Sequence, residues 1–593
     1  MNRPLAVAAL AFAIAGLVYQ ALLPVALRAW PATGDEPHYL LAAHSLAFDG
    51  DLDLANNYAN RDYAAFYPAG FLDPHVRVQP DGAQLLSHDL GLPLLIALPY
   101  AAGGRAGVLQ FQVVLGALLA AQMALLGYEA AGKWWAGLLG ALALALTAPL
   151  GLYTFQVYPE LAGSLLFLWA LRQSLETPAW LASASPSPHS RLKRLALGLA
   201  LAALPWLSGR YAPLAALLGL VWLGRLGRRQ GTRAMLQPSA GLVAAAMGIS
   251  LFAYLATNYH FFGGPTPSAT PAGNAVLTGF ADVDAQQIGR GLLGWWLDQH
   301  RGLLAFGPAL ALAFIGLPHV WQRRRWAGLA LLAPAALMTL LAAAWGGFYS
   351  GWEVSAKFLI VTLPPLAAGV AAVLAGIAGR WRRRAFWPLA AGLLTLSAGQ
   401  AFIMLADPFV VLHQSPVTIW EQATGLTLRR FFPAAGTRYI EYPPAGEWRA
   451  ARGPAQTLHQ SGPIAELSVG WYRLYAQAQV AGAADPQAIA LSVEAYSSEA
   501  GLPLFTAAVR ARDADSAAGL VSVSVPFFNP YVDRWNYPFY VDVRASGAAE
   551  VRLSRLLFEP DPLPTYGIAG LWLAGLALLT LACAPPKQKP AAR

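Results

Sequence analysis

Long apolar runs recur along most of this chain, and they constrain its fold more than any other feature. Runs long enough to cross roughly 30 Å of hydrocarbon lie at 5–27, 108–129, 134–152, 158–176, 193–208, 211–227, 238–261, 302–320, 327–348, 357–378, 385–406 and 564–583. Only 12% of the 593 residues are charged and 56% are hydrophobic, whereas soluble domains contain about 25% charged residues. The sequence therefore predicts a multi-span α-helical membrane protein with about twelve transmembrane helices.

The first apolar run is interpreted as a retained span. It is longer than the roughly 7 to 15 residues of a secretory hydrophobic region, and Arg28, Trp30 and Pro31 follow it instead of a small-residue cleavage site. The single cysteine, Cys583, lies in the last apolar run. One cysteine excludes both a disulfide framework and a cysteine-based metal site.

The positions of the basic residues predict the orientation in the membrane. Clusters at 191–194, 225–233, 323–325 and 380–384, together with the basic C-terminal tail, all fall on one side if the spans alternate. Short cytoplasmic loops carry an excess of Lys and Arg, so both termini are predicted to be cytoplasmic. The net charge of +9 thus reflects topology, and no nucleic-acid partner is predicted.

The segment 29–107 is predicted to be one long loop on the outer side. The apolar stretch 90–104 within it contains Pro93 and Pro99 and is too short for a span, so it is interpreted as an interfacial or re-entrant helix. Nine acidic residues stand in the loop against three basic ones. The loop is therefore locally acidic in a basic protein.

A second outer segment, 407–562, changes to the period of β-strands. Apolar residues alternate or run in short pieces at 467–480, 488–496, 502–511, 519–528 and 537–545, with Gly, Pro, Asn and Asp between them. This pattern predicts an extracytoplasmic all-β, sandwich-like domain before the last span. Three regions are therefore expected: a membrane module at 1–406, the β domain at 407–562, and a final helix with a basic tail at 563–593.

Polar motifs gather in the predicted outer turns of the membrane module. They are GDEPHYL (34–40), TFQVYPE (154–160), PWLSGRYAP (205–213), GLLGWWLDQHRGLL (291–304) and AWGGFYSGWEVSAKF (344–358). Carboxylates come from some turns and cations with Trp or Tyr from others. If the topology holds, all of them meet at one leaflet boundary.

Together these motifs resemble the type C glycosyltransferases of the inner membrane, which include the protein mannosyltransferases and the lipid A aminoarabinose transferases. The resemblance rests on the Asp-Glu pair shortly after the first span and on the pattern of the outer turns, and it covers roughly 1–406. One departure lies in the last turn, where relatives often carry Pro-Gly-Arg. This chain has Gly351, Trp352 and Glu353 there, followed by Lys357.

The resemblance implies transfer of a sugar from a polyprenyl phosphate in the membrane to an acceptor hydroxyl of a glycan, lipid or protein, with inversion. Such a reaction needs a carboxylate to accept the hydroxyl proton and fixed cations for the leaving phosphate. Asp35 is the candidate base, and Glu36 orients it or shares its role. Proposed substrate or phosphate contacts are Arg210, Tyr211, Lys357, Glu160, His38, Trp352 and Glu353, with Trp295 and Trp296 as wall residues.

Each of these residues also has a structural explanation. Thr33 or Asp35 could cap a helix that begins with Glu36 and Pro37. Cations such as those of Arg210 and Lys357 often reach the interface with their apolar stems buried. The tryptophans suit an interfacial aromatic belt, and Glu160 suits the first turn of a helix.

A metal ion is a minor alternative. His38 and His44 are six residues apart, which is no metal spacing on one helix face, but with Asp35 or Glu36 they could bind a divalent ion. Zinc signatures are absent. The run DGDLDL at 49–54 lacks the twelve-residue ligand set of a calcium loop, so its aspartates are predicted to be turn residues.

Two other functional classes are open at this stage. A transporter or flippase usually has ionisable residues or broken helices near the bilayer midplane, whereas here the ionisable residues collect at one surface. A noncatalytic scaffold would explain the β domain but not the long first loop.

Overall fold

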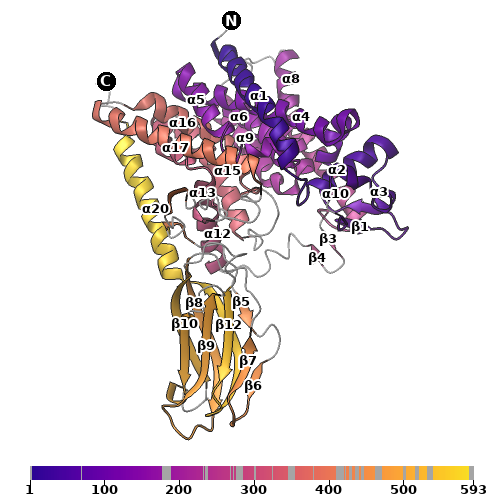
Figure 1. Ribbon diagram of the computed structural model, residues 1–593. Helices are drawn as coiled ribbons and strands as arrows, with labels where there is room; N and C mark the ends of the chain where they lie inside the picture. Colours follow the sequence, from indigo (N-terminus) through magenta and orange to yellow (C-terminus); the bar gives the residue numbers. More distant parts are fainter. Residues whose placement is uncertain are drawn as a thin grey trace. The chain divides into compact units, whose positions relative to one another are not determined.

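A computed structural model describes most of the chain. The described residues are 3–68, 70–175, 188–231, 233, 238–267, 269–270, 273–274, 285–299, 302–323, 325–344, 354, 356–377, 380–408, 420, 423–425, 431–433, 440–442, 447–460, 470–497, 503–513, 520–529 and 539–585. They form two compact units (Figure 1). The helical unit comprises Met1–Trp295, Phe306–His413 and Gly575–Arg593, and the β unit comprises Trp296–Ala305 and Gln414–Ala574.

Six helices in the described part of the chain are long and apolar enough to cross a membrane. They are α1 (Arg3–Ala29), α4 (Gly91–Ala131), α10 (Pro238–Phe262), α15 (Arg325–Ala344), α17 (Arg380–Ala406) and α20 (Pro562–Cys583). Large apolar side chains on them are exposed, for example Leu17 at 72% and Phe252 at 74%. Exposed apolar side chains on long apolar helices are typical of membrane-spanning segments. The helical membrane architecture is supported, and the count of about twelve spans stays a prediction.

The remaining predicted spans correspond to shorter or broken helices. They are α5 (Trp134–Ala145), α6 (Pro159–Leu175), α8 (Pro188–Leu207), α9 (Ala212–Gln230), α13 (Leu303–Phe306), α14 (Leu310–Arg323) and α16 (Ala367–Gly376). The continuous helices expected at 134–152, 302–320 and 357–378 are therefore wrong in part. A proline lies at each interruption, namely Pro149, Pro308 and Pro364. Proline has no backbone N–H, so it cannot donate the hydrogen bond that would continue the helix.

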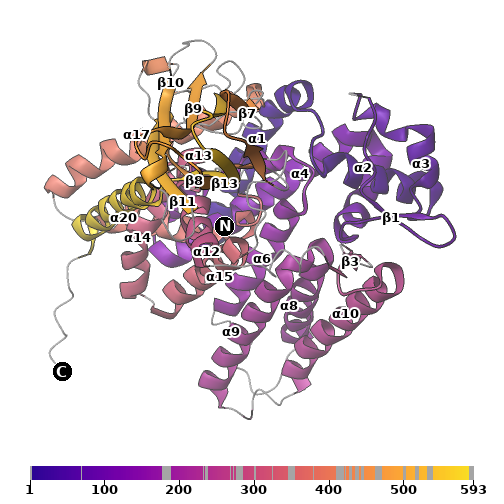
Figure 2. The ribbon, with the colours of Figure 1, turned by 90° about the horizontal axis from the view of Figure 1, so that it is seen from below.

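Helix packing in the helical unit depends on small residues. The buried positions of α1 include Val7, Ala11, Ala15 and Tyr19 at a spacing of four, which is one face of a helix. This face packs against α4, and α8 lies beside α10 (Figure 2). Small side chains let the helix backbones approach closely.

The first loop, 29–107, which is predicted to lie on the outer side, folds into short elements ahead of α4. These are α2 (Glu36–His44), a π-helical turn (Ser45–Asp49), α3 (Ala55–Asn60), a 3₁₀ turn (Asp62–Ala65) and a hairpin of β1 (Val76–Val78) and β2 (Gln84–Leu86). Asp51 and Asp53 stabilise the bend between the π-helical turn and α3, as predicted for this run, whereas Asp49 ends the π-helical turn. Oδ1 of Asp51 accepts from Ser45 at 2.9 Å, and Oδ1 of Asp53 accepts the Gln84 N–H at 2.8 Å.

The stretch 90–104 is helical, and a kink separates it from the helix that follows. Gly103 and Gly104 have non-helical backbone angles inside α4. The first part of α4 is thus a segment distinct from the apolar helix after the kink, in agreement with the separate helix expected from the sequence.

The β unit contains two antiparallel sheets with a shared apolar core (Figure 1). One sheet has the order β10-β9-β12-β7 and the other β11-β8-β13-β5, with β6 paired to β13. The strands are β5 (Ile440–Tyr442), β6 (Trp448–Ala450), β7 (Gln456–Gln460), β8 (Gly470–Ala481), β9 (Ile489–Ser497), β10 (Pro503–Arg510), β11 (Leu520–Asn529), β12 (Phe539–Ala545) and β13 (Glu550–Pro560). Alternate residues such as Val541 and Val543 are fully buried. The five strands expected from period-2 alternation are confirmed.

Candidate active site

Asp35 stands at the start of α2 but does not cap it. Gly34 before it has φ +59°, a left-handed conformation that glycine adopts without strain, and this turn leads the chain into α2. The side chain of Asp35 makes no capping hydrogen bond. Its backbone N–H donates to the Tyr158 hydroxyl at 3.2 Å, and that hydroxyl donates to the Thr33 carbonyl at 3.0 Å. The carboxylate is thus left for other partners.

The partner of the Asp35 carboxylate is Lys357. The ammonium donates to Oδ2 of Asp35, and it lies 4.5 Å from the centre of the Tyr158 ring. The side chain of Asp35 is only 22% exposed and that of Lys357 only 12%. Burial alone would raise the pKa of Asp35, but Lys357, His88 and His75 outweigh it and hold that pKa well below its ordinary value. Asp35 is therefore ionised at neutral pH.

The neighbouring carboxyl group, Glu36, has a different environment. It is 1% exposed, and burial raises its pKa to about 8, although Arg105 opposes the shift. Glu36 is therefore largely protonated near pH 7, so only Asp35 of the adjacent pair carries a full negative charge. The environment favours Asp35 over Glu36 as a proton acceptor.

A second buried ion pair joins Arg210 to Glu160. Arg210 lies in the 3₁₀ turn Gly209–Tyr211 and donates to Oε1 of Glu160, whose side chain is fully buried. The guanidinium carbon lies 4.5 Å from the centre of the Phe358 ring, and Trp295 packs edge-on against that ring at 5.7 Å. The cation is therefore held by the Glu160 carboxylate and lies against the Phe358 ring.

The two ion pairs belong to one site because two short segments, 357–358 and 158–160, each contact both pairs. Lys357 pairs with Asp35, and Phe358 beside it stacks on Arg210. On the other side, Tyr158 contacts Lys357, and Glu160 pairs with Arg210. The turns around 35, 158–160, 210 and 357–358, expected to meet at one surface, do meet.

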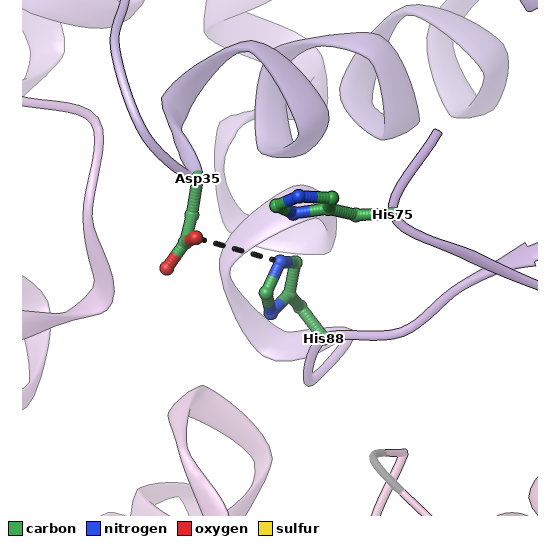
Figure 3. A group of neighbouring side chains, drawn as sticks. All are labelled: Asp35, His75 and His88. Carbon is green, nitrogen blue, oxygen red and sulfur yellow. Dashed lines mark ion pairs between the residues drawn. The ribbon is translucent and has the colours of Figure 1, made fainter. Parts of the chain in front are cut away.

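Three histidines of the first loop surround Asp35. One ligand atom each of Asp35, His75 and His88 lie within 4.8 Å of one another (Figure 3). The ring of His38 stacks on His75 with centroids 3.9 Å apart, and its Nδ1 lies 2.9 Å from the Tyr58 hydroxyl. Burial lowers the pKa of His38 to about 3 and that of His88 to about 4, the latter against the attraction of Asp35.

The minor alternative raised from the sequence, a metal site with His38 and His44 beside Asp35 or Glu36, is not formed. His44 faces away from His38, with Nε2 at 3.8 Å from Asp62 and Nδ1 at 3.3 Å from the Tyr100 hydroxyl. Glu36 is not among the grouped ligand atoms either. Of the residues weighed as metal ligands in that alternative, only Asp35 belongs to the observed group, because the segments that flank the hairpin supply the two imidazoles and α2 does not.

Asp89 connects the first loop to the turn that carries Arg210. Its carboxylate accepts the Gly209 N–H at 2.9 Å and the Tyr254 hydroxyl at 2.7 Å. Burial raises its pKa to about 6, although these hydrogen bonds oppose the shift. The roles of His88 and Asp89 were not predicted. The polar triplet Ser87-His88-Asp89 directly before the apolar start of α4 was the available signal.

The other predicted contact residues have mixed outcomes. Tyr211 is fully buried, with its ring 5.6 Å from the Arg210 guanidinium. Trp296 belongs to the β unit. Trp352 and Glu353 lie outside the described residues.

Comparisons with known proteins give a distant likeness. No protein-family model matches the chain, and no curated protein sequence matches it either. Among solved structures, the chain is similar to the oligosaccharyltransferase of Archaeoglobus fulgidus in its apo form, with 14% identity and a TM-score of 0.40. The match covers 70% of this chain and 57% of that one. A likeness this distant does not identify the activity of this chain.

Proposed function

We propose that this protein is a membrane glycosyltransferase of the type C architecture, which moves a sugar from a polyprenyl-phosphate carrier to an acceptor hydroxyl. The observation that carries the proposal is the joined pair of ion pairs, in which Lys357 is held largely out of water beside the ionised Asp35 and Arg210 beside Glu160. Cations fixed in this way stabilise negative charge that develops on a leaving phosphate. A carboxylate beside them can take a proton from an acceptor.

The position of the site suits a substrate with a membrane tail. Asp35 follows α1 by six residues, and Arg210 lies between α8 and α9. Both groups are at helix ends, where the headgroup of a lipid carrier is found while its tail stays in hydrocarbon. In this proposal the site faces the outer side of the inner membrane, both termini are cytoplasmic, and the β domain at 407–562 is extracytoplasmic.

The proposed step is a single displacement with inversion. The acceptor oxygen forms a bond to the anomeric carbon while the bond from that carbon to the carrier phosphate breaks. The hydroxyl proton passes to Oδ2 of Asp35, and the electron pair of the broken bond leaves on the polyprenyl phosphate. Lys357 occupies Oδ2 without substrate, so it must shift toward the phosphate as the donor binds. That shift removes the cation that keeps Asp35 weakly basic.

Arg210 and Lys357 have different tasks in this step. The guanidinium offers a planar fork that suits a phosphate, whereas the ammonium acts as a movable point charge. Glu160 and Phe358 keep Arg210 in place. Tyr158, His38, Tyr211 and Trp295 provide ring surfaces around the charged groups.

The test uses purified full-length protein with polyprenyl-phosphate sugars and a panel of glycan, lipid and protein acceptors. Release of polyprenyl phosphate is measured. Asp35→Asn should lower the rate about 100- to 10,000-fold. Asp81→Asn is the matched control, because Asp81 is in the hairpin turn of the same loop and caps only the Ala83 N–H. Equal rates for Asp35→Asn and the wild type would overturn the assignment of the base.

A further inference from the structure

Two imidazoles and one carboxylate converge in the first outer loop. Oδ1 of Asp35 lies 3.8 Å from Nε2 of His88, and one ligand atom from each of Asp35, His75 and His88 lies within 4.8 Å of those of the other two (Figure 3). Nε2 of His88 is buried and makes no hydrogen bond with any described residue. A buried ring nitrogen with no hydrogen bond needs another partner.

The backbone holds the two imidazoles in place. His75 directly precedes β1, and His88 lies two residues after β2. The strands pair in the register Val76↔Leu86, and the Ser87 N–H donates to the His75 carbonyl at 2.9 Å, which closes the base of the hairpin. Both histidines therefore project from one rigid end of a hairpin.

Further contacts fix the orientation of the group. The His38 ring stacks on His75 at an interplanar angle of 16°, which restricts rotation of the His75 side chain. Asp89, next to His88, is bonded to Gly209 and Tyr254. The carboxylate of Asp35 is set by the start of α2. Metal sites depend on such supporting contacts around their ligands.

We propose that Asp35, His75 and His88 form a binding site for a divalent transition-metal ion. Two imidazoles with one carboxylate select ions such as Zn²⁺ or Co²⁺ over Mg²⁺ and Ca²⁺, which prefer oxygen ligands. Bonds of about 2.1 Å in a tetrahedral site place neighbouring ligand atoms roughly 3.4 Å apart. The separations in the observed group, up to 4.8 Å, have to shorten by up to about 1.4 Å, within the reach of side-chain rotation. Three protein ligands leave a coordination position open, and exposed His75 gives an ion access.

The proposed metal ion and the Lys357 ammonium would contact different oxygens of Asp35. The ammonium donates to Oδ2, whereas His88 faces Oδ1. An ion on Oδ1 adds positive charge beside Lys357 and weakens its pairing with Oδ2. Metal binding should therefore release Lys357 toward an anionic ligand. The binding site itself does not depend on the proposed glycosyl transfer.

The experiment is a metal titration of the full-length protein in detergent after removal of metals with a chelator. Co²⁺ is the probe, because its visible absorption reports the ligand set, and Zn²⁺ is the competitor. Wild type should bind Co²⁺ with absorption bands of a nitrogen- and oxygen-ligated ion, and Zn²⁺ should displace it. His75→Ala and His88→Ala should each weaken binding at least about 100-fold, beyond the effect of losing a supporting contact.

His44→Ala is the matched control, since His44 lies in the same loop but faces Asp62 and Tyr100. It should bind Co²⁺ like wild type. His75 is exposed, so its replacement leaves the protein core intact and keeps the test valid if His88→Ala fails to fold. Wild-type affinity in His75→Ala would overturn the proposal. Donor turnover by metal-free protein would not contradict the metal site. Loss of Co²⁺ binding alone would not contradict the transferase assignment.

Discussion

Lys357 donates a hydrogen bond to Oδ2 of Asp35, a residue 322 positions earlier in the chain. The pair links the start of α2 to the turn before α16, and Phe358, next in sequence, stacks on Arg210. A short segment of the chain thus organises both ion pairs. Ala356, just before Lys357, has φ +63°, an uncommon conformation for a residue with a Cβ that is often found at functional sites.

Removing Lys357 should destabilise the protein through the charge it leaves behind. Lys357→Met leaves the carboxylate of Asp35 largely buried without its cation, at a cost of about 2–3 kcal/mol. Asp35→Asn combined with Lys357→Met should recover much of this loss, because neither charge remains. Thermal unfolding in detergent measures the four midpoints of this double-mutant cycle. Additive effects of the two substitutions would show that the pair contributes no coupling.

Arg210→Lys should reduce activity although the charge is retained. Lysine keeps a cation near Glu160 but loses the planar fork and the stacking on Phe358. We expect at least about a tenfold lower rate of polyprenyl-phosphate release, mostly in kcat. Arg61→Lys, on an exposed arginine of the first loop, is the control and should behave like wild type. A rate for Arg210→Lys equal to that of this control would argue against phosphate binding at Arg210.

Gly163→Ala should disturb the turn that carries Arg210. A Cβ at position 163 in α6 would lie 2.8 Å from a ring carbon of Tyr211, so the ring and its neighbour Arg210 must move. Overpacking of this kind costs about 1–3 kcal/mol, and both the thermal midpoint and the activity should fall. Gly224→Ala in α9 meets nothing within 4 Å and should be neutral or slightly stabilising. Similar midpoints for the two variants would contradict this account.

The elements that the sequence predicted well are those with a local periodic signal. Period-2 alternation located the strands from 467 to 545, and apolar length located the six long helices. Breaks within spans were harder to predict from the sequence. A proline can end a helix, as at Pro308, or only kink it, and the neighbouring residues decide which occurs.

Four residues of the candidate site could be picked out from the sequence, but their pairings could not. Asp35, Glu160, Arg210 and Lys357 stood out as charges beside apolar runs. Which charge pairs with which depends on tertiary contacts that no local pattern encodes. His88 was missed for the same reason, since only the closed hairpin brings it beside His75.

Asp89→Ala should loosen the first loop from the turn that carries Arg210. The substitution leaves the Gly209 N–H and the Tyr254 hydroxyl without their acceptor, at a cost of about 1–3 kcal/mol. Amide hydrogen exchange should rise in the hairpin and in the turn 209–211. Tyr254→Phe removes only one of the two hydrogen bonds and should give a smaller change in the same segments. Unchanged exchange at the turn in Asp89→Ala would show that Asp89 does not hold the two segments together.

Metal addition should stabilise the wild type, and chelation should reverse the effect. An ion that binds the folded state and not the unfolded state adds about 2.7 kcal/mol at a hundred times its dissociation constant. We therefore expect Zn²⁺ to raise the thermal midpoint of metal-free protein. His88→Ala and His75→Ala should lose this rise, because each removes a ligand of the group within 4.8 Å. His44→Ala should keep it, since that imidazole contacts Asp62 and Tyr100 instead. A rise of the same size in all four proteins would place the ion elsewhere, and no rise in the wild type would mean that the three side chains bind no ion in the folded state.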